Sequence, residues 1–151
     1  MNRESYSFEK HEDSMYAYAF LSVGKQGNIT KVVYFQEISQ RIYNLAMGDA
    51  TDDINKPIDD MKVSNNGDMP KVMATVAKIM VKFLAQNTHA TILIEGNTPT
   101  KKALYQRIIT NNIQDLAPLF VILGIDVGGN ILSFEPQISY EALIIKLNPL
   151  T

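Results

Sequence analysis

The first third of the chain shows a two-residue alternation of side chains that predicts antiparallel strands. Over residues 15–23 aromatic side chains alternate with small or aliphatic ones, a pattern that favours a strand. Residues 29–38 repeat the alternation and are rich in β-branched and aromatic side chains. We expect these two strands to pair through a turn at Lys25–Asn28, where Gly27 can adopt a positive φ. A third strand is predicted over residues 42–47.

The period of the apolar positions changes to that of a helix near residue 69. Apolar side chains at 72, 76, 79, 80, 83 and 84 form one stripe, which predicts a helix over residues 70–86. The same kind of stripe predicts a second helix over residues 100–114. Short apolar runs predict four further strands, over residues 91–95, 119–125, 131–135 and 140–147.

The order of these elements predicts an α+β fold, with a mixed, largely antiparallel sheet and two main helices. We expect residues 1–151 to form a single domain, in which residues 1–14 are a loosely ordered tail. Residues 50–68 are predicted to be a polar loop, because they contain few apolar side chains and a proline, Pro57.

The composition is that of a globular domain and excludes several kinds of chemistry. Of 151 residues, 46% are hydrophobic and 20% are charged, which is enough apolar surface for a core. The absence of cysteine excludes disulfides, thiolate nucleophiles and cysteine zinc sites. No apolar run approaches the roughly 20 residues that cross a bilayer, and a net charge of −2 argues against a nucleic-acid partner. We therefore expect a cytoplasmic protein with no membrane partner.

Charge is distributed unevenly along the chain. Residues 1–68 carry seven basic and eleven acidic side chains, whereas residues 69–151 carry seven basic and five acidic ones. Clustered carboxylates can hold Mg²⁺ or Ca²⁺, but the spacing here matches no calcium-binding loop. We therefore predict a solvated acidic loop and no metal site for the cluster Asp49, Asp52, Asp53, Asp59, Asp60 and Asp68.

The loop that enters the first predicted helix is a candidate anion site. Backbone N–H groups at a helix start, with a glycine that allows close approach, can bind the pyrophosphate of a nucleotide or of coenzyme A. Asn65, Asn66 and Gly67 are the candidate contacts. The alternative is an ordinary capped helix start, with Asp68 as the N-cap and Pro70 in the first turn. A carboxylate at Asp68 favours this alternative, because it would repel a phosphate.

Asn97 and Tyr105 form a second candidate site. Asn97 follows a predicted buried strand, and Tyr105 lies in the second turn of the next helix, where its hydroxyl could act as a general acid. The alternative is that Tyr105 is a core aromatic residue with its hydroxyl at the rim. The two histidines, His11 and His89, stand in polar surroundings and are predicted to be surface side chains.

Several segments of the chain carry a family resemblance, namely Tyr43–Asp49 (YNLAMGD), Val63–Asp68 (VSNNGD), Lys71–Ala77 (KVMATVA), Gly96–Thr98, Arg107 and Tyr140–Ala142. With these segments the sequence resembles a family of short bacterial proteins of unknown function, a resemblance that implies no assigned activity. It covers most of the chain, from about Tyr16 to Leu147.

A second, looser resemblance rests on the order of the predicted elements and on Asn97, Ala103, Leu104 and Tyr105. The topology resembles the GCN5-related N-acetyltransferase fold, and these residues are similar to the end of that family's last conserved motif. The resemblance implies that Tyr105 protonates the departing coenzyme A thiolate, and that coenzyme A lies over residues 65–67. The chain departs from the family's pyrophosphate-loop pattern, with Ser64 in place of Gln or Arg and Met69 in place of the second small residue.

Three functional hypotheses follow. The first is a non-catalytic binding or interaction module on an acetyltransferase-like scaffold, acting through an unidentified protein or small-molecule partner. The second is a minimal acetyl-coenzyme A-dependent N-acyltransferase, with Tyr105 as general acid. The third is a metal-dependent hydrolase built on the aspartates, which we rank last.

A homodimer is compatible with the sequence. We also predict that Asn97, Tyr105 and residues 64–68 converge in space, because a right-handed crossover joins their strands.

Overall fold

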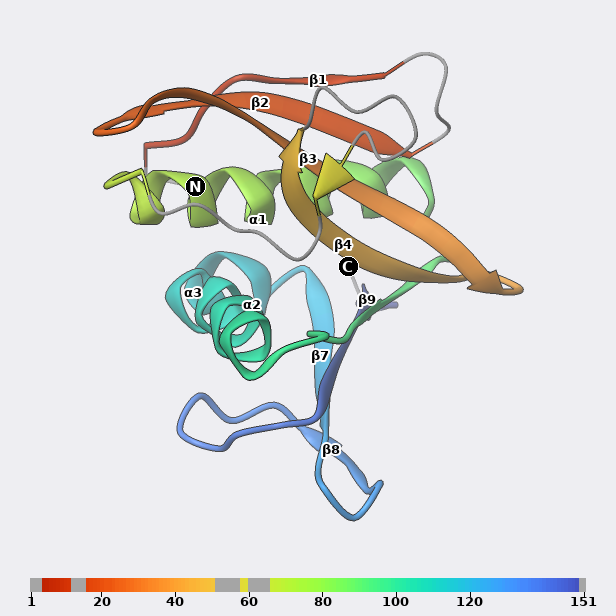
Figure 1. The fold of residues 1–151 in the computed structure, drawn as a ribbon. Coiled ribbons are helices and arrows are strands. Elements are labelled where there is room, and N and C mark those ends of the chain that lie inside the picture. Colours follow the sequence, from red (N-terminus) through yellow and green to blue (C-terminus); the bar gives the residue numbers. More distant parts are fainter. Residues whose placement is uncertain (1–3, 12–15, 51–57, 60–65, 150–151) are drawn as a thin grey trace.

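A computed structural model of the protein describes residues 4–11, 16–50, 58–59 and 66–149 (Figure 1). The described strands are β1 (Phe8–Lys10), β2 (Ala17–Gly24), β3 (Gly27–Ser39), β4 (Ile42–Ala50), β5 (Ile58–Asp59), β6 (Thr91–Ile94), β7 (Phe120–Ile125), β8 (Ile131–Ser133) and β9 (Ala142–Leu147). The described helices are α1 (Met69–Gln86), α2 (Pro99–Asn111) and α3 (Ile113–Leu116).

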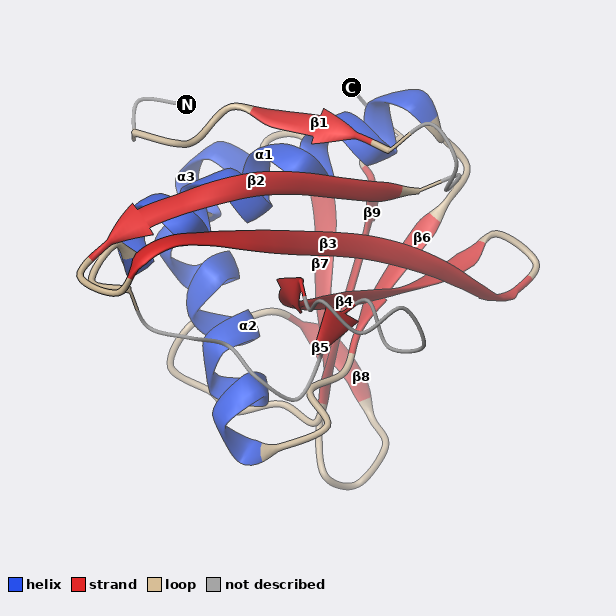
Figure 2. Cartoon of the chain, turned by 45° about the horizontal axis from the view of Figure 1, so that its top comes forward, coloured by secondary structure: helices blue, strands red, loops and turns tan. Residues whose placement is uncertain are grey.

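The strands form one sheet in the order β1-β2-β3-β4-β6-β9-β7-β8, with β5 paired to β4. All pairs are antiparallel except β4 with β6, which run parallel. The helices lie on one side of this twisted sheet, α1 along β2 and β3 and α2 beside β7 (Figures 1 and 2). The predicted α+β class, with its largely antiparallel sheet and two long helices, is confirmed.

The core forms where the inward faces of the strands meet the apolar stripe of α1. Phe83 of α1 stacks on Phe35 of β3, with ring centroids 4.1 Å apart, and meets Tyr16 and Tyr43 edge to face. Burying several aromatic rings in one cluster contributes large apolar areas and additional ring-pair energy. The odd-numbered residues of β3 and β4 supply the inward face, as the predicted alternation requires.

Element boundaries differ from the predictions in three places. The second predicted helix breaks into α2 and α3 at Asn112, whose side chain donates to the backbone oxygen of Ile108 at 2.7 Å. In the predicted tail, residues 8–10 form β1 on the edge of β2. In the predicted polar loop, residues 58–59 form β5, which pairs with the last two residues of β4. The sequence analysis missed β1 and β5 because strands of three and two residues carry little periodicity.

Candidate functional site

The two central parallel strands of the sheet diverge soon after they pair. β4 and β6 are in register only from Ile42 with Thr91 to Asn44 with Leu93. Beyond these residues β4 continues to Ala50, whereas β6 ends at Ile94. Between the residues that pair with β6 and those that pair with β5, β4 contacts helix α2 at Met47.

Side chains from α2 occupy this edge of β4. The Tyr105 hydroxyl accepts the backbone N–H of Met47 at 3.2 Å, and the Lys101 ammonium donates to the backbone oxygen of Met47 at 3.0 Å. Both side chains are buried, with exposed fractions of 4%. The candidate acid Tyr105 is thus a core aromatic residue that completes strand hydrogen bonding in place of a neighbouring strand.

A buried ion pair lies two residues further along β4. Lys31 and Asp49 face each other across β3 and β4, and the ammonium lies 2.6 Å from the carboxylate. Lys31 is only 1% exposed, because it continues the inward row of Val33 and Phe35 on β3. A charge at such a position is tolerated when its partner is equally buried. Of the other aspartates in the acidic cluster, Asp52, Asp53 and Asp60 lie outside the described residues.

The loop before α1 packs against the β2–β3 turn. The Asn66 amide oxygen accepts the backbone N–H of Gln26 at 2.5 Å, and its amide nitrogen donates to the backbone oxygen of Gly27 at 2.8 Å. The Asn66 backbone oxygen accepts the N–H of Lys25 at 3.0 Å. Gly24 permits this approach, since a Cβ there would lie 1.9 Å from that oxygen. Asn66, which is 1% exposed, therefore stabilises the turn through these hydrogen bonds.

The other candidate residues of this loop are placed as follows. Gly67 is exposed and has a φ of +82°, the conformation that favours glycine. Asn65 lies outside the described residues. Asp68 occupies the N-cap position, but its side chain makes no cap hydrogen bond. Its carboxylate instead accepts hydrogen bonds from the hydroxyls of Tyr6 and Ser22, at 2.5 and 2.6 Å.

Asn97 is exposed at the turn into α2, one residue before the N-cap. The cap is Thr98, whose hydroxyl accepts the N–H of Lys101 at 3.1 Å. Gly96 lets this turn approach the helix, because a Cβ there would lie 2.3 Å from the Lys102 nitrogen. Tyr105 therefore packs on β4 while Asn66 packs on the β2–β3 turn, and the convergence of these residues with Asn97 stays a prediction.

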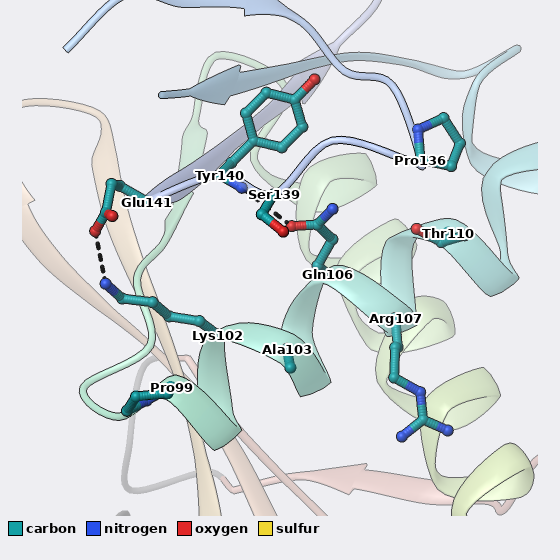
Figure 3. Close-up of a pocket in the computed structure, with 10 residues that line it drawn as sticks. All are labelled: Pro99, Lys102, Ala103, Gln106, Arg107, Thr110, Pro136, Ser139, Tyr140 and Glu141. Atoms are coloured by element: carbon teal, nitrogen blue, oxygen red, sulfur yellow. Dashed lines mark hydrogen bonds and ion pairs between the residues drawn. The ribbon is translucent and has the colours of Figure 1, made fainter. Parts of the chain in front are cut away.

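A groove that the sequence did not indicate runs along the exposed face of α2 (Figure 3). We call it the α2 groove; its volume is about 460 Å³. One wall is α2 and the other is the β8–β9 loop. Its lining residues are Pro99, Lys102, Ala103, Gln106, Arg107 and Thr110 of α2, and Pro136, Ser139, Tyr140 and Glu141 of the loop.

Three sets of contacts hold the loop wall of the α2 groove in place. The Gln106 amide donates to the backbone oxygen of Ile138 and accepts the N–H of Tyr140 at 3.3 Å, as a neighbouring strand would. The Lys102 ammonium lies 2.6 Å from the Glu141 carboxylate (Figure 3). The Tyr140 ring packs over Gly124, where a Cβ would come within 2.3 Å of it. The groove is therefore preformed, which is typical of binding sites.

The Tyr140 hydroxyl reinforces the same wall. It accepts the N–H of Glu135 at 2.9 Å and donates to the backbone oxygen of Ser133 at 3.3 Å. These bonds close the edge of β8 just after its last residue, so the loop cannot swing away from the sheet without losing them.

The α2 groove offers a ligand one cationic donor, Arg107, together with hydroxyls that can donate or accept. The Arg107 guanidinium makes no hydrogen bond or ion pair with any residue that the structure describes. The same holds for the side-chain hydroxyls of Thr110 and Ser139, within the described ranges. Arg107 extends away from the loop, on the open side of α2 (Figure 3). An acceptor, and an anionic one above all, would complement this arrangement.

Burial also perturbs the pKa of a tyrosine that lines a second pocket. Burial raises the pKa of Tyr43 to about 12, with hydrogen bonding to Tyr16 as the next cause. Tyr43 and His89 line a smaller pocket of about 280 Å³ beside Arg41.

The described parts of the chain contain no group of three His, Cys, Asp or Glu residues placed to hold a metal ion. None of the described helices is long and apolar enough to cross a membrane.

Comparison with known proteins identifies a family but no function. A family model described as "Family of unknown function (DUF6934)" matches residues 2–148. The match confirms the resemblance to an uncharacterised family and does not bear on the acetyltransferase resemblance. No curated protein and no solved structure matches the chain.

Proposed function

The chain belongs to the family of unknown function DUF6934, and we propose that it is a non-catalytic binding module whose ligand site is the α2 groove. The alternative is the minimal acetyl-coenzyme A-dependent N-acyltransferase with Tyr105 as general acid. One feature favours that alternative, namely the divergence of β4 from β6 after three paired residues. Open α/β sheets keep their ligand crevices at points of this kind.

The observation that carries the proposal is the way α2 fills this divergence. A general acid has to reach the leaving group within hydrogen-bond distance. The Tyr105 hydroxyl accepts the N–H of Met47 in the interior, and the Lys101 ammonium donates a hydrogen bond to the Met47 carbonyl. A thioester could reach the hydroxyl only if α2 moved away from β4. This favours a structural role for Tyr105 and weakens the acyltransferase hypothesis.

The loop at residues 66–68 gives independent support. The Asn66 amide is committed to the β2–β3 turn through both its oxygen and its nitrogen. The Asp68 carboxylate lies at the start of α1, where a pyrophosphate would have to bind. Two negative groups about 4 Å apart near a protein surface repel by about 4 kcal/mol. Coenzyme A binding over this loop is therefore disfavoured.

The α2 groove, in contrast, has the properties of a ligand site. Its loop wall is held by Gln106 and by the Tyr140 ring, so little ordering entropy has to be lost on binding. Arg107, Thr110 and Ser139 present donors without partners among the described residues. We propose that the ligand carries an anionic acceptor group, and that binding is the activity of the domain.

Nuclear magnetic resonance of the full chain tests this proposal with two probes, acetyl-coenzyme A and glutarate. We expect glutarate to shift the amide resonances of Arg107, Thr110 and Ser139. We expect acetyl-coenzyme A to leave Gly67, Asn97 and Tyr105 unperturbed. An Arg107→Gln variant should lose the glutarate shifts, whereas Lys146→Gln, which removes an exposed charge from β9, should keep them.

Two outcomes would contradict the proposal. One is a set of acetyl-coenzyme A shifts centred on Gly67 and Asn97, together with acetyl transfer to an amine that Tyr105→Phe abolishes. That result would establish the acyltransferase. The other is glutarate shifts that are scattered over surface lysines and are unchanged by Arg107→Gln, which would remove the α2 groove as the ligand site.

A further inference from the structure

We infer that the α2 groove binds an extended peptide segment and that Arg107 binds an acidic side chain of that segment. This inference rests on the proposed function, because it names the ligand class of the same site. Length, exposure and charge of the groove each contribute to it.

The length of the groove matches a short extended chain. Its α2 wall runs from Pro99 to Thr110. At about 1.5 Å of rise per residue this wall is roughly 16 Å long. An extended peptide advances about 3.3 Å per residue, so about five residues would span it.

The openness of the groove favours a peptide over a compact small molecule. Six of the lining residues are exposed, namely Pro99, Ala103, Arg107, Pro136, Ser139 and Glu141. Small-molecule sites usually enclose about 70–90% of the ligand surface, which a groove with such exposed walls does not do. A peptide that lies along the groove keeps one side of its backbone in water, where its amides remain solvated. Ala103, the smallest of these side chains, leaves room for the chain at the middle of the helix.

The charges of the groove select an acidic side chain. Lys102 is neutralised by Glu141, 2.6 Å away. Arg107 also lines the groove, and none of the described residues forms an ion pair with it. Guanidinium binds carboxylate through two parallel hydrogen bonds, and Thr110, three residues along the same helix face, adds a hydroxyl donor. Glu141 would repel a second acidic residue at the Lys102 end, so the acid is placed toward Thr110.

Fluorescence anisotropy with labelled pentapeptides tests the inference. The probes are Ala-Ala-Glu-Ala-Ala and the same peptide with Gln or Lys in place of Glu. The full chain should bind the Glu peptide about tenfold more tightly than the Gln peptide at low salt, since hydrogen bonds to charged groups are the stronger ones. The Lys peptide should bind least, and added salt should reduce the preference for Glu.

Charge reversal provides the sharpest variant. Arg107→Glu should invert the order, so that the Lys peptide binds more tightly than the Glu peptide. Arg107 is exposed, so this variant should fold, and its thermal unfolding curve verifies that. Lys146→Gln changes the net charge as Arg107→Gln does, and it should leave all three affinities within about twofold.

The outcomes separate this inference from the proposed function. Equal binding of the Glu and Gln peptides would overturn the inference, as would an equal loss in Lys146→Gln and Arg107→Gln. If glutarate shifts the groove resonances but the Glu peptide binds no more tightly than glutarate, the ligand is a small anion. The inference then fails while the proposed function stands. If neither probe perturbs the groove, both fail.

Discussion

The Tyr105 hydroxyl lies 3.2 Å from the backbone nitrogen of Met47 and accepts its N–H, so a helix side chain completes the edge of strand β4. Met47 itself is fully buried. The N–H therefore has no access to water if the hydroxyl is removed. We therefore expect the first effect of replacing Tyr105, the candidate general acid, to be on stability.

We expect Tyr105→Phe to lower the free energy of unfolding by about 1–3 kcal/mol, because an unsatisfied buried donor costs that much. Tyr105→Ala, which also removes the ring, should cost about 3–5 kcal/mol. Urea unfolding followed by circular dichroism measures both changes. A Tyr105→Phe variant as stable as the natural protein would contradict the hydrogen bond and reopen a catalytic role.

The Lys31–Asp49 pair should be strongly coupled in stability. Replacing either residue alone by alanine leaves the other charge in the interior, and we expect each single change to cost about 3–5 kcal/mol. The double replacement should cost clearly less than the sum of the two. A double-mutant cycle by urea unfolding measures this coupling.

The matched control is the Lys102–Glu141 pair, which has the same 2.6 Å separation but exposed fractions of 38% and 48% for the two side chains. Its coupling should be below about 1 kcal/mol, because water screens it. Similar couplings for the two pairs would show that burial does not set the strength of the first.

Gly124→Ala should destabilise the protein and disturb the α2 groove. The added methyl would lie 2.3 Å from the Tyr140 ring, closer than side chains pack. Either the ring or the strand has to shift, at a cost of about 1–3 kcal/mol. Because Tyr140 holds the loop wall, peptide affinity should fall as well. Thermal unfolding and anisotropy measure the two effects.

The control for this prediction is the Tyr140→Ala background, in which the ring is absent. There the Gly124→Ala change should cost much less than it does in the natural protein. An equal cost in both backgrounds would place the effect in the strand backbone and exclude the ring as its cause.

Stability should fall at high pH through Tyr43. Burial raises its pKa to about 12 in the folded protein, whereas an unfolded tyrosine titrates near about 10. The folded state therefore holds the proton over this interval. The stabilising contribution is full below about pH 10 and is lost as the pH rises to about 12.

Urea unfolding at a series of pH values measures this loss. Burial is also the main cause of the raised pKa values of Tyr6 and Tyr18, so the natural protein should lose stability through several groups. Tyr43→Phe should make the decline above pH 10 shallower. A decline of unchanged steepness would show that Tyr43 does not contribute.

The periodic spacing of apolar residues predicted the helices and strands that have one face buried along their whole length. The stripe over residues 70–86 agrees with α1 to within one residue, because each apolar position in it contacts the core. The alternation over residues 29–38 predicted strand β3, in which the structure buries Val33 and Phe35, and Lys31 is in phase with them. The phase could have indicated a buried lysine. Its partner, Asp49, depends on the register between β3 and β4.

The candidate site illustrates where local patterns stop. Tyr105 was predicted to be either an acid or a core residue, and both were consistent with its place on a helix. Its contact with Met47, 58 residues earlier in the chain, favours the core position. Asn66 likewise looked like a loop residue available to a ligand. Its amide is held by the turn at Gln26 and Gly27, 40 and 39 residues away.

By itself, the sequence determined the fold class, the two long helices and most strands, since periodic burial is a property of neighbouring residues. The tertiary structure alone decided the strand order, which sets β9 between β6 and β7. That order brings the β8–β9 loop against α2 and creates the α2 groove. Gln106 meets Ile138 and Tyr140 there. The physical reason is that pairing between distant strands depends on the combined packing of the whole sheet, which no local window of residues contains.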